Sequence, residues 1–371
     1  MKILFHLNSL GHGGAERVVS ILSGELVSQG HEVVIATEWY SDKEYALDPK
    51  VKRINVGLRE DDPSLRPIKV IRRYTNVRKC IRKELPHVVI SFCNKANFRC
   101  SVGMLGIKIP LIVSVRNDPN TDYAPYRLST RLMERRANGC VFQTAQALAY
   151  FDKALGERSV IIPNPLSEQY CRETAFHYQA ESFKDDLPVI SIGRIAPQKN
   201  QKLLIEAFCQ VAKEFPQACL NIYGNYEDEA YLNELKGMIS EYDLEQKVNL
   251  CGVSTHVIDE LKKSYMFVLS SDYEGMPNAL MEAMSLGLPC ISTDCPCGGP
   301  HMLLKEMQPD SESGVLVPVG DVNALSDAML SLLKDRAYAQ ELGNAARFIK
   351  EKADPANICR QWIDYIEEVV G

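Results

Sequence analysis

The chain has 371 residues, of which 46% are hydrophobic, and this is enough for two globular domains with full cores. Its formal net charge of −6 argues against nucleic acid as the main partner. No apolar run approaches the roughly 20 residues that a membrane-spanning helix needs. Residues 1–5 lead into a predicted strand and a glycine turn, not a signal peptide, so we expect a cytoplasmic protein or one held on the inner face of the cell membrane.

Short apolar runs alternate with helical segments in the first half of the chain. The helical stretch 15–29, for example, separates the first two runs. This alternation is typical of parallel sheets that are covered by helices. The runs that we expect to form strands are 3–7, 33–36, 88–92, 111–115 and 139–143.

The glycine-rich segment 11–14 follows the first predicted strand and precedes a helix. It resembles a dinucleotide fingerprint, but Glu16 stands where the third glycine should be, which lowers the case for a nicotinamide enzyme. Glycines allow a phosphate to approach the backbone closely. A simple tight turn is the alternative interpretation.

The segment 66–83 combines eight basic residues with an apolar stripe at helical spacing. A basic amphipathic helix suits an anionic membrane surface or a lipid diphosphate. A core-packed helix with a solvated face would explain the stripe alone. A second basic cluster lies at 127–136. The bases of the first segment are Arg66, Lys69, Arg72, Arg73, Arg78, Lys79, Arg82 and Lys83, and its stripe is Val70, Tyr74, Val77 and Ile81.

The strand and helix alternation begins again after a proline-flanked, polar stretch. The final segment 354–370 has apolar residues at helical spacing. We therefore predict two doubly wound Rossmann-like domains, 1–165 (plus 354–371) and 187–353, joined by a linker at 166–186 and facing each other across a cleft. The predicted strands of the second half are 189–192, 219–223, 247–250, 267–269 and 289–292.

Two cations, Arg194 and Lys199, lie five residues apart in the turn after the strand 189–192. An arginine grips a diphosphate with two donors, and a lysine adds a point charge. A solvated, charged entrance to a helix is the alternative interpretation.

Two carboxylates, Glu274 and Glu282, flank the turn that follows the strand 267–269, and a helix is predicted to begin at Asn278. Carboxylates accept hydrogen bonds from sugar hydroxyls. An exposed loop carboxylate and a favourable interaction with the helix dipole are the alternatives. Together with the two cations, these residues suggest a site for a nucleoside diphosphate joined to a sugar.

In this order, the segments resemble those of the family 4 glycosyltransferases, a retaining, metal-independent class with the GT-B fold. Glu274 and Glu282 match the two-glutamate signature of that family, and Arg194 and Lys199 match its phosphate-binding pair. The segments 11–16 and 314–321 extend the resemblance over nearly the whole chain. The resemblance implies an α/β GT-B protein whose last helix crosses back to the N-terminal domain, similar to glycosyltransferases of bacterial polysaccharide and lipid-linked oligosaccharide assembly.

The resemblance also implies roles for individual residues. Arg194 and Lys199 would stabilise the leaving diphosphate and Glu274 would orient the transferred sugar, which makes these three the candidate catalytic residues. Glu282 would hold the ribose hydroxyls. The other candidate donor-binding positions are Gly13, Gly14, Gly193, Val253, Met276, Asn278, Ala279 and Leu280.

Three positions depart from the family pattern or stay open. Arg116 stands where many members have a histidine, so it is a candidate substrate-binding residue whose partner is the donor phosphate, the acceptor or Asp118. Asn164, between two prolines, is the second candidate of this kind. Tyr226 replaces the second glycine of a usual Gly-x-Gly turn, which leaves the shape of that loop and its nucleotide contact open.

We expect no metal cofactor, because the two cations supply the positive charge that a metal would bring. The acidic run 227–229 is interpreted as a helix cap. His12 and His301 have no sequence partner that marks either as a base. A same-face displacement, in which a leaving phosphate oxygen takes the proton, needs no protein base.

The predicted function is retaining transfer of a hexose or N-acetylhexosamine from a nucleotide-diphosphate sugar, UDP-linked by family expectation, to a glycan acceptor. The family context favours an acceptor on a lipid diphosphate, in bacterial surface polysaccharide assembly. A non-catalytic nucleotide-sugar-binding subunit is the main alternative. A nucleotide-dependent dehydrogenase is the other, and the broken glycine pattern counts against it.

Overall fold

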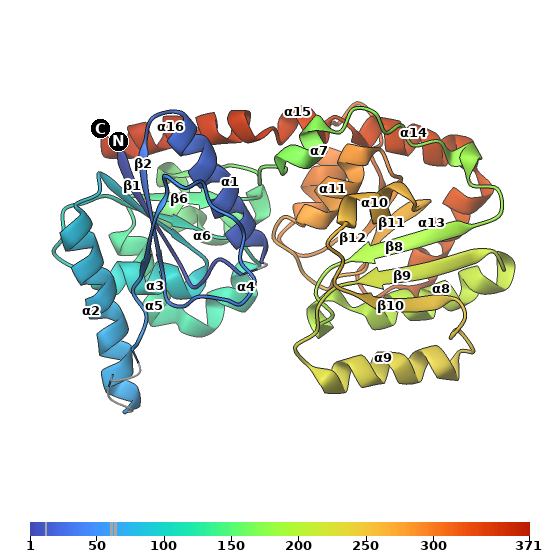
Figure 1. The fold of residues 1–371 in the computed structure, drawn as a ribbon, viewed down its shortest axis with the longest axis horizontal. Coiled ribbons are helices and arrows are strands. Elements are labelled where there is room, and N and C mark those ends of the chain that lie inside the picture. Colours follow the sequence, from blue (N-terminus) through green and yellow to red (C-terminus); the bar gives the residue numbers. More distant parts are fainter. Residues whose placement is uncertain (12, 60–61, 63–64) are drawn as a thin grey trace. The chain divides into compact units, whose positions relative to one another are not determined.

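The computed structural model describes residues 1–11, 13–59, 62 and 65–371, and the chain forms two compact units. Unit 1 comprises Met1–Pro165 and Pro355–Gly371, and unit 2 comprises Leu166–Asp354. Each unit is a parallel sheet with helices packed on it (Figure 1). Both are therefore doubly wound α/β folds, as the alternation of apolar runs and helical segments predicted.

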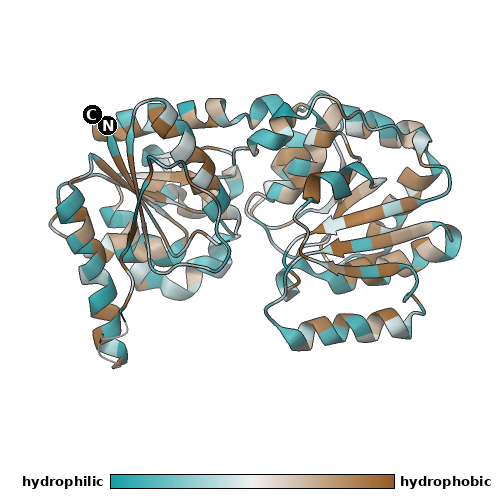
Figure 2. Cartoon of the chain, in the orientation of Figure 1, coloured by the Kyte–Doolittle hydropathy of each residue, from teal (hydrophilic) through white to brown (hydrophobic). Residues whose placement is uncertain are grey.

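The sheet of unit 1 has seven strands in the order β3-β2-β1-β4-β5-β6-β7. Its inner strands are apolar along their length because helices cover both faces, and Figure 2 shows this contrast with the hydrophilic outer helix surfaces. All five predicted strands of this half are present. The strands are β1 (Lys2–Leu7), β2 (Glu32–Thr37), β3 (Lys52–Asn55), β4 (Val88–Phe92), β5 (Leu111–Ser114), β6 (Gly139–Phe142) and β7 (Ser159–Ile161).

The last helix of the chain packs in unit 1. On α16, Ile358, Trp362 and Ile366 are buried in the same core as α1, and Trp362 stacks on Phe92 of β4 with ring centroids 5.7 Å apart. The predicted return of the C-terminal segment to the first domain is thus confirmed. The main helices of unit 1 are α1 (Gly14–Ser28), α2 (Arg66–Glu84), α3 (Asn94–Gly103), α4 (Pro119–Asp122), α5 (Arg127–Arg136), α6 (Ala145–Leu155) and α16 (Pro355–Val370).

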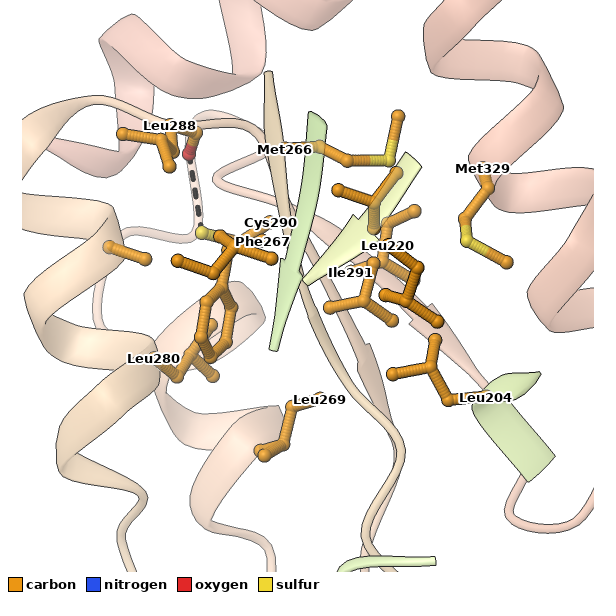
Figure 3. Packing of buried hydrophobic residues seen from close by; sticks show 14 of the residues in the cluster. Leu204, Leu220, Met266, Phe267, Leu269, Leu280, Leu288, Cys290, Ile291 and Met329 are labelled. Atoms are coloured by element: carbon orange, nitrogen blue, oxygen red, sulfur yellow. Dashed lines mark hydrogen bonds between the residues drawn. The ribbon is translucent and has the colours of Figure 1, made fainter. Parts of the chain in front are cut away.

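The sheet of unit 2 has six strands in the order β10-β9-β8-β11-β12-β13. Its centre is a dense apolar core in which Phe267, Leu280 and Cys290 lie on one side of the sheet and Leu204, Leu220 and Met329 on the other (Figure 3). The five predicted strands are again present. The strands are β8 (Leu187–Ile192), β9 (Ala218–Tyr223), β10 (Val248–Gly252), β11 (Met266–Leu269), β12 (Cys290–Thr293) and β13 (Val315–Val317).

Helices connect these strands and extend the core. Among them, α11 follows the strand β11 directly and is buried along most of its length. The helices of unit 2 are α7 (Glu168–Arg172), α8 (Gln201–Glu214), α9 (Glu229–Glu241), α10 (Val257–Lys262), α11 (Asn278–Leu286), α12 (Gly299–His301), α13 (Val322–Lys334), α14 (Arg336–Ala346) and α15 (Ile349–Lys352). Over the part of the chain that the structure describes, no helix is both long and apolar enough to cross a bilayer.

The linker expected at 166–186 is wrong, because this segment is part of unit 2. Leu166, Tyr170 and Tyr178 are buried in the core of unit 2, and the backbone N–H of Leu166 donates to the carbonyl oxygen of Ala353 at 2.8 Å. The segment is polar on average, but a few irregularly spaced aromatic and aliphatic side chains anchor it. That spacing matches neither a helix nor a strand, so the sequence pattern did not reveal the burial.

The strand orders locate one switch point in each sheet. In unit 1 the strands that follow β1 are added on one side of it and the strands that follow β4 on the other side of the sheet. In unit 2 the same reversal of strand order occurs between β8 and β11. In open parallel sheets, ligands bind in the crevice at the carboxyl ends of the two strands that flank such a point. A ligand site in unit 2 is therefore expected at the loops that follow β8 and β11.

Candidate active site

The loops after β8 and β11 are joined by several hydrogen bonds. The backbone N–H of Asp272 donates to the carbonyl oxygen of Gln198 at 2.9 Å, and the Gln198 side chain donates to the carbonyl oxygen of Tyr273 at 2.9 Å. The Asn200 amide donates to Asp272 Oδ1 at 2.7 Å. Asn200 is left-handed, with φ of 44°, and its side-chain oxygen caps α8. The two loops thus form one fixed surface at the switch point.

Lys199 and Glu274, one from each loop, form an ion pair on this surface. The Ser271 hydroxyl donates to the same Glu274 oxygen at 2.6 Å. The side chains of Lys199 and Glu274 are only 19% and 8% exposed, so both charges are largely removed from water. The structure therefore brings together two of the three candidate catalytic residues and adds Ser271, which the sequence did not single out.

Arg194, the third candidate, is exposed beside this pair. One of its terminal nitrogens lies 3.9 Å from Glu227 Oε1, and the other donates to Gln198 Oε1 at 3.5 Å. Both are long contacts that hold the guanidinium weakly. A guanidinium in this state keeps most of its donors available for an anionic ligand.

Glycine is required where the backbones of this edge meet. A Cβ atom on Gly224 would lie 1.8 Å from the carbonyl oxygen of Gly193, and one on Gly299 would lie 1.6 Å from that of Gly275. The loops after β8, β9, β11 and β12 therefore touch through bare backbone. Close packing of this kind leaves the amide groups of the edge near any ligand that binds there.

The helix α11 begins at Asn278, as predicted, and places Glu282 one turn inside it, where the residue is buried. Leu280 lies in the apolar core, and Met276 is buried in the preceding turn. Ala279 packs partly against the same core. The candidate donor-binding positions on this loop and helix thus form one continuous segment next to the Lys199–Glu274 pair.

Val253 lies at the same carboxyl edge, directly after β10. Its side chain is exposed, and the preceding Gly252 has a positive φ of 69°. The structure thus gathers all candidate catalytic residues, and the donor-binding candidates from Gly193 onward, along one edge of unit 2.

The remaining donor-binding candidates, Gly13 and Gly14, lie in unit 1 after β1. Gly13 caps α1, and a Cβ atom on it would lie 2.0 Å from Glu16 Oε2. Glu16, which stands in place of the third glycine of a dinucleotide fingerprint, therefore has its carboxylate directly against Gly13. His12 lies outside the residues that the structure describes.

Arg116 and Asn164, the two substrate-binding candidates, contact each other in unit 1. An Arg116 terminal nitrogen donates to Asn164 Oδ1 at 2.9 Å, and the guanidinium carbon lies 4.6 Å from the ring centroid of Phe92 and 5.6 Å from that of Trp362. Burial lowers the pKa of Arg116 to about 10. Asp118, one of the partners considered for Arg116, instead accepts from the backbone N–H groups of Asn120 and Thr121 as the cap of α4.

His301 has a partner that the sequence did not reveal. Its Nδ1 lies 3.2 Å from Asp294 Oδ1, and both side chains are partly exposed in the loop after β12. The two residues lie on either side of a turn in which the N–H of Gly298 donates to the carbonyl oxygen of Cys295 at 3.1 Å. No sequence signal marks such a pair.

The acidic run 227–229 contains a helix cap, as interpreted from the sequence. Asp228 accepts from the backbone N–H groups of Ala230 and Tyr231 at the start of α9. Within residues 1–11, 13–59, 62 and 65–371, no group of three or more His, Cys, Asp and Glu side chains is placed to hold a metal ion.

This edge of unit 2 thus presents an exposed guanidinium, a lysine paired with a carboxylate, and a helix that opens beside them. Cations and backbone amides can bind a diphosphate, and carboxylates can accept hydrogen bonds from sugar hydroxyls. Two family models match the chain, "Glycosyltransferase Family 4" over residues 12–170 and "Glycosyl transferases group 1" over residues 173–348. The chain belongs to the family 4 glycosyltransferases.

Individual relatives agree with this assignment. The chain is 28% identical over 365 residues to an uncharacterised glycosyltransferase of Methanocaldococcus jannaschii, covering 86% of this chain and 89% of the relative. It is 26% identical over 381 residues to the Campylobacter jejuni GalNAc-alpha-(1->4)-GalNAc-alpha-(1->3)-diNAcBac-PP-undecaprenol alpha-1,4-N-acetyl-D-galactosaminyltransferase, covering 100% and 99%.

Among solved structures, Anabaena HepE in complex with UDP and glucose superimposes with a TM-score of 0.79 at 18% identity, covering 99% of both chains. The match over both units shows that this family 4 glycosyltransferase has the GT-B fold. The predicted fold and enzyme class are both confirmed.

Proposed function

We propose that this glycosyltransferase transfers a hexose or N-acetylhexosamine, with retention of configuration, from a UDP-sugar to a glycan carried on a lipid diphosphate. We place this reaction in the assembly of a bacterial surface polysaccharide. The observation that carries the proposal is the Lys199–Glu274 ion pair beside the exposed Arg194 at the β8/β11 switch point. These residues offer cations for the diphosphate and a carboxylate for the sugar hydroxyls on one fixed surface.

The donor would replace the ion pair with two separate contacts. Lys199 would turn to the diphosphate together with Arg194, and Glu274, still held by Ser271, would accept from a hydroxyl of the sugar. Glu282 would hold the ribose. The complex of HepE with UDP and glucose supports UDP as the nucleotide in a protein of the same fold.

In the proposed step, the bond between the sugar C1 and the diphosphate oxygen breaks as the acceptor oxygen bonds to C1 on the same face. The proton of the acceptor hydroxyl passes to an oxygen of the leaving diphosphate, so the protein supplies no base. Negative charge grows on the diphosphate during this step. Arg194 and Lys199 stabilise that charge more in the transition state than in the ground state, which is the role that we give to these two cations in place of a metal.

The proposed acceptor class rests on the Campylobacter jejuni relative, whose name gives a glycan on undecaprenyl diphosphate as its acceptor. We assign acceptor binding to unit 1. We assign a positioning role in this region to Arg116, a half-buried residue that is hydrogen-bonded to Asn164 at the carboxyl edge of that unit.

We also propose that α2 binds an anionic membrane surface through the side chains that unit 1 leaves exposed. Val77 and Ile81 are buried in unit 1, as a core-packed helix predicts, but Leu65 and Ile71 are 64% and 61% exposed, and the N-terminal turns project from unit 1 (Figure 1). Three of the eight bases have partners within the unit: Arg72 pairs with Asp62, Arg73 with Glu38, and Arg78 donates to the carbonyl oxygen of Gly103. The other five bases are Arg66, Lys69, Lys79, Arg82 and Lys83. Among the described residues, none of these five forms an ion pair.

The experiment that tests the proposal is a transfer assay with UDP-glucose, UDP-galactose and UDP-N-acetylgalactosamine, in which a polyprenyl-diphosphate-linked glycan is the acceptor. The expected product carries one added sugar whose anomeric configuration, read by NMR, equals that of the donor. Inversion would overturn the same-face step. Binding of UDP-sugars without release of UDP under any acceptor condition would favour the non-catalytic subunit.

A further inference from the structure

Tyr226 is an exposed aromatic residue on the edge of unit 2 that holds the candidate donor site. Its side chain is 46% exposed. Among the residues that the structure describes, its ring stacks on no other ring and its hydroxyl makes no hydrogen bond. Single exposed aromatic residues are common on protein surfaces, so the exposure alone carries no function. A function for Tyr226 is suggested by its position next to the candidate donor site.

Tyr226 is attached to the donor site through the backbone. It pairs with Ile195 in an isolated parallel bridge, and the N–H of Ile195 donates to the carbonyl oxygen of Asn225 at 2.8 Å. Ile195 is buried and directly follows Arg194. The backbone of Tyr226 is therefore held beside that of Ile195, the neighbour of Arg194, whose guanidinium we assign to the diphosphate.

Glycine backbone forms the strand ends next to Tyr226. The carboxyl ends of β8, β9 and β10 are closed by Gly193, Gly224 and Gly252, and the N–H of Gly224 donates to the carbonyl oxygen of Gly252 at 2.8 Å. The close approach of Gly224 to Gly193 leaves no room for a Cβ atom. The first side chain after β10 is that of Val253, which is 54% exposed. Tyr226 after β9 and Val253 after β10 are thus exposed side chains that follow neighbouring strands, with glycine backbone at the strand ends.

We infer that Tyr226 stacks on the base of the nucleoside diphosphate and so contributes to the choice of nucleotide. A planar base has two apolar faces, and an aromatic ring with a free face binds such a surface by stacking. The backbone near Val253 can read the edge of the base but offers no ring for its face. Tyr226 supplies that ring where the family pattern has a glycine. This inference rests on the proposed function, because it requires a nucleotide at this edge.

The test compares two ligands that differ in the flatness of the base. UDP has a planar aromatic uracil, whereas 5,6-dihydro-UDP keeps the diphosphate, the ribose and the carbonyl groups of the base but has a puckered ring. Binding of both is measured by calorimetry for wild type, Tyr226→Ala and Tyr226→Phe. The thermal midpoint of each ligand-free variant is measured as well, and the exposure of Tyr226 predicts that it stays unchanged.

We expect Tyr226→Ala to weaken UDP binding roughly tenfold and to weaken dihydro-UDP binding by less than about twofold. Tyr226→Phe keeps the ring and should bind UDP as wild type does. Equal weakening of both ligands, or no weakening of either, would overturn the stacking role and leave the proposed function intact. A wild-type protein that binds no UDP would overturn the proposed function and this inference together.

Discussion

Lys199 and Glu274 neutralise each other at the switch point of unit 2, although they lie 75 residues apart in the sequence. One is assigned to the diphosphate and the other to the sugar of the same donor. A ligand-free site that contained an isolated lysine and an isolated buried carboxylate would be costly to maintain. The ion pair stabilises the empty site, and a donor that offers a diphosphate to one residue and a hydroxyl to the other can replace it.

Removing Lys199 alone should therefore reduce both stability and activity. Lys199→Ala leaves the 8%-exposed Glu274 carboxylate without its cation, and we expect a loss of about 1–3 kcal/mol in the free energy of unfolding. The turnover rate should fall about 100-fold or more. Denaturant unfolding and UDP release measure the two effects.

The double variant Lys199→Met with Glu274→Gln separates these effects. It removes both charges while keeping the side-chain volumes, so the stability should return close to that of wild type. Activity should stay low. Recovery of activity together with stability would contradict a direct role of the two residues in the reaction.

Arg194→Ala should lower the turnover rate more than it weakens donor binding. In the proposed step, Arg194 stabilises negative charge that grows as the sugar–diphosphate bond breaks, so we expect its loss to reduce kcat about 100-fold and to raise KM by much less. Its two contacts are long, so the melting temperature should change little. Lys202→Ala is the matched control, because Lys202 is a partly exposed cation on α8 that pairs with Glu234. Equal effects of both variants would show that Arg194 contributes only general positive charge.

The reaction should proceed in the presence of a chelator. In the proposed site, Arg194 and Lys199 would balance the diphosphate charge that a divalent cation balances in other enzymes. Initial rates measured with EDTA and with added Mn²⁺ or Mg²⁺ should agree within about twofold, because the proposed step uses no metal. A loss of activity with EDTA that Mn²⁺ restores would refute the proposed source of positive charge.

Binding to anionic vesicles should depend on the unpaired bases of α2. Replacing Arg66, Lys69, Lys79, Arg82 and Lys83 by glutamine removes about 1 kcal/mol of attraction per base near the surface, so sedimentation with phosphatidylglycerol vesicles should fall strongly. The change Ile71→Ser removes an exposed apolar contact and should weaken binding further. Replacing Arg72, which pairs with Asp62, is the control. Unchanged sedimentation of the variant that combines the five glutamines with Ile71→Ser would exclude α2 as the membrane contact.

Acid should destabilise unit 1 through His6. This residue is fully buried, its Nδ1 donates to the carbonyl oxygen of Ala36 at 2.9 Å, and burial, with the nearby charge of Arg99, lowers its pKa to about 3. Between pH 6.5 and 3 the unfolded chain binds a proton that the folded protein does not. The contribution of His6 to stability is thus complete above pH 6.5 and is lost as the pH falls, at up to about 1.4 kcal/mol per pH unit.

The variant His6→Asn isolates this effect, because the amide keeps a donor near Ala36 and does not titrate. The free energy of unfolding of wild type should fall more steeply between pH 6.5 and 4.5 than that of the variant, by up to about 2.7 kcal/mol over this range. Parallel curves would mean that His6 is protonated in the folded protein.

Much of the fold could be predicted from the sequence, because strands covered by helices on both faces are unbroken apolar runs. The strands that were missed are different in kind. The edge strand β3 reads Lys-Arg-Ile-Asn, and β7 and β13 have only three residues each. Edge strands need little burial, so their composition carries little signal. The sequence predicts a linker at 166–186 because this segment is polar on average. Its burial depends on a few apolar side chains, which carry little signal in the composition.

The candidate site could be predicted because its residues fall in short segments of the sequence, each in or next to a single loop. Arg194 and Lys199 share the loop after β8, and their spacing is visible in the sequence. The contacts between loops were not visible, because they depend on the order of the strands. The pairs Lys199–Glu274, Arg116–Asn164 and Asp294–His301 all form across turns or between strands that only the folded chain brings together.

The most direct test of the central claim is a calorimetric titration of UDP, with EDTA present, into wild type and Glu282→Gln. Glu282 is buried in α11, and glutamine keeps its shape while removing its charge. We expect one UDP site in the wild type and binding at least about tenfold weaker in the variant, since a charged hydrogen bond to the ribose is lost. Equal binding by both proteins, or none by the wild type, would contradict a donor site at this edge of unit 2.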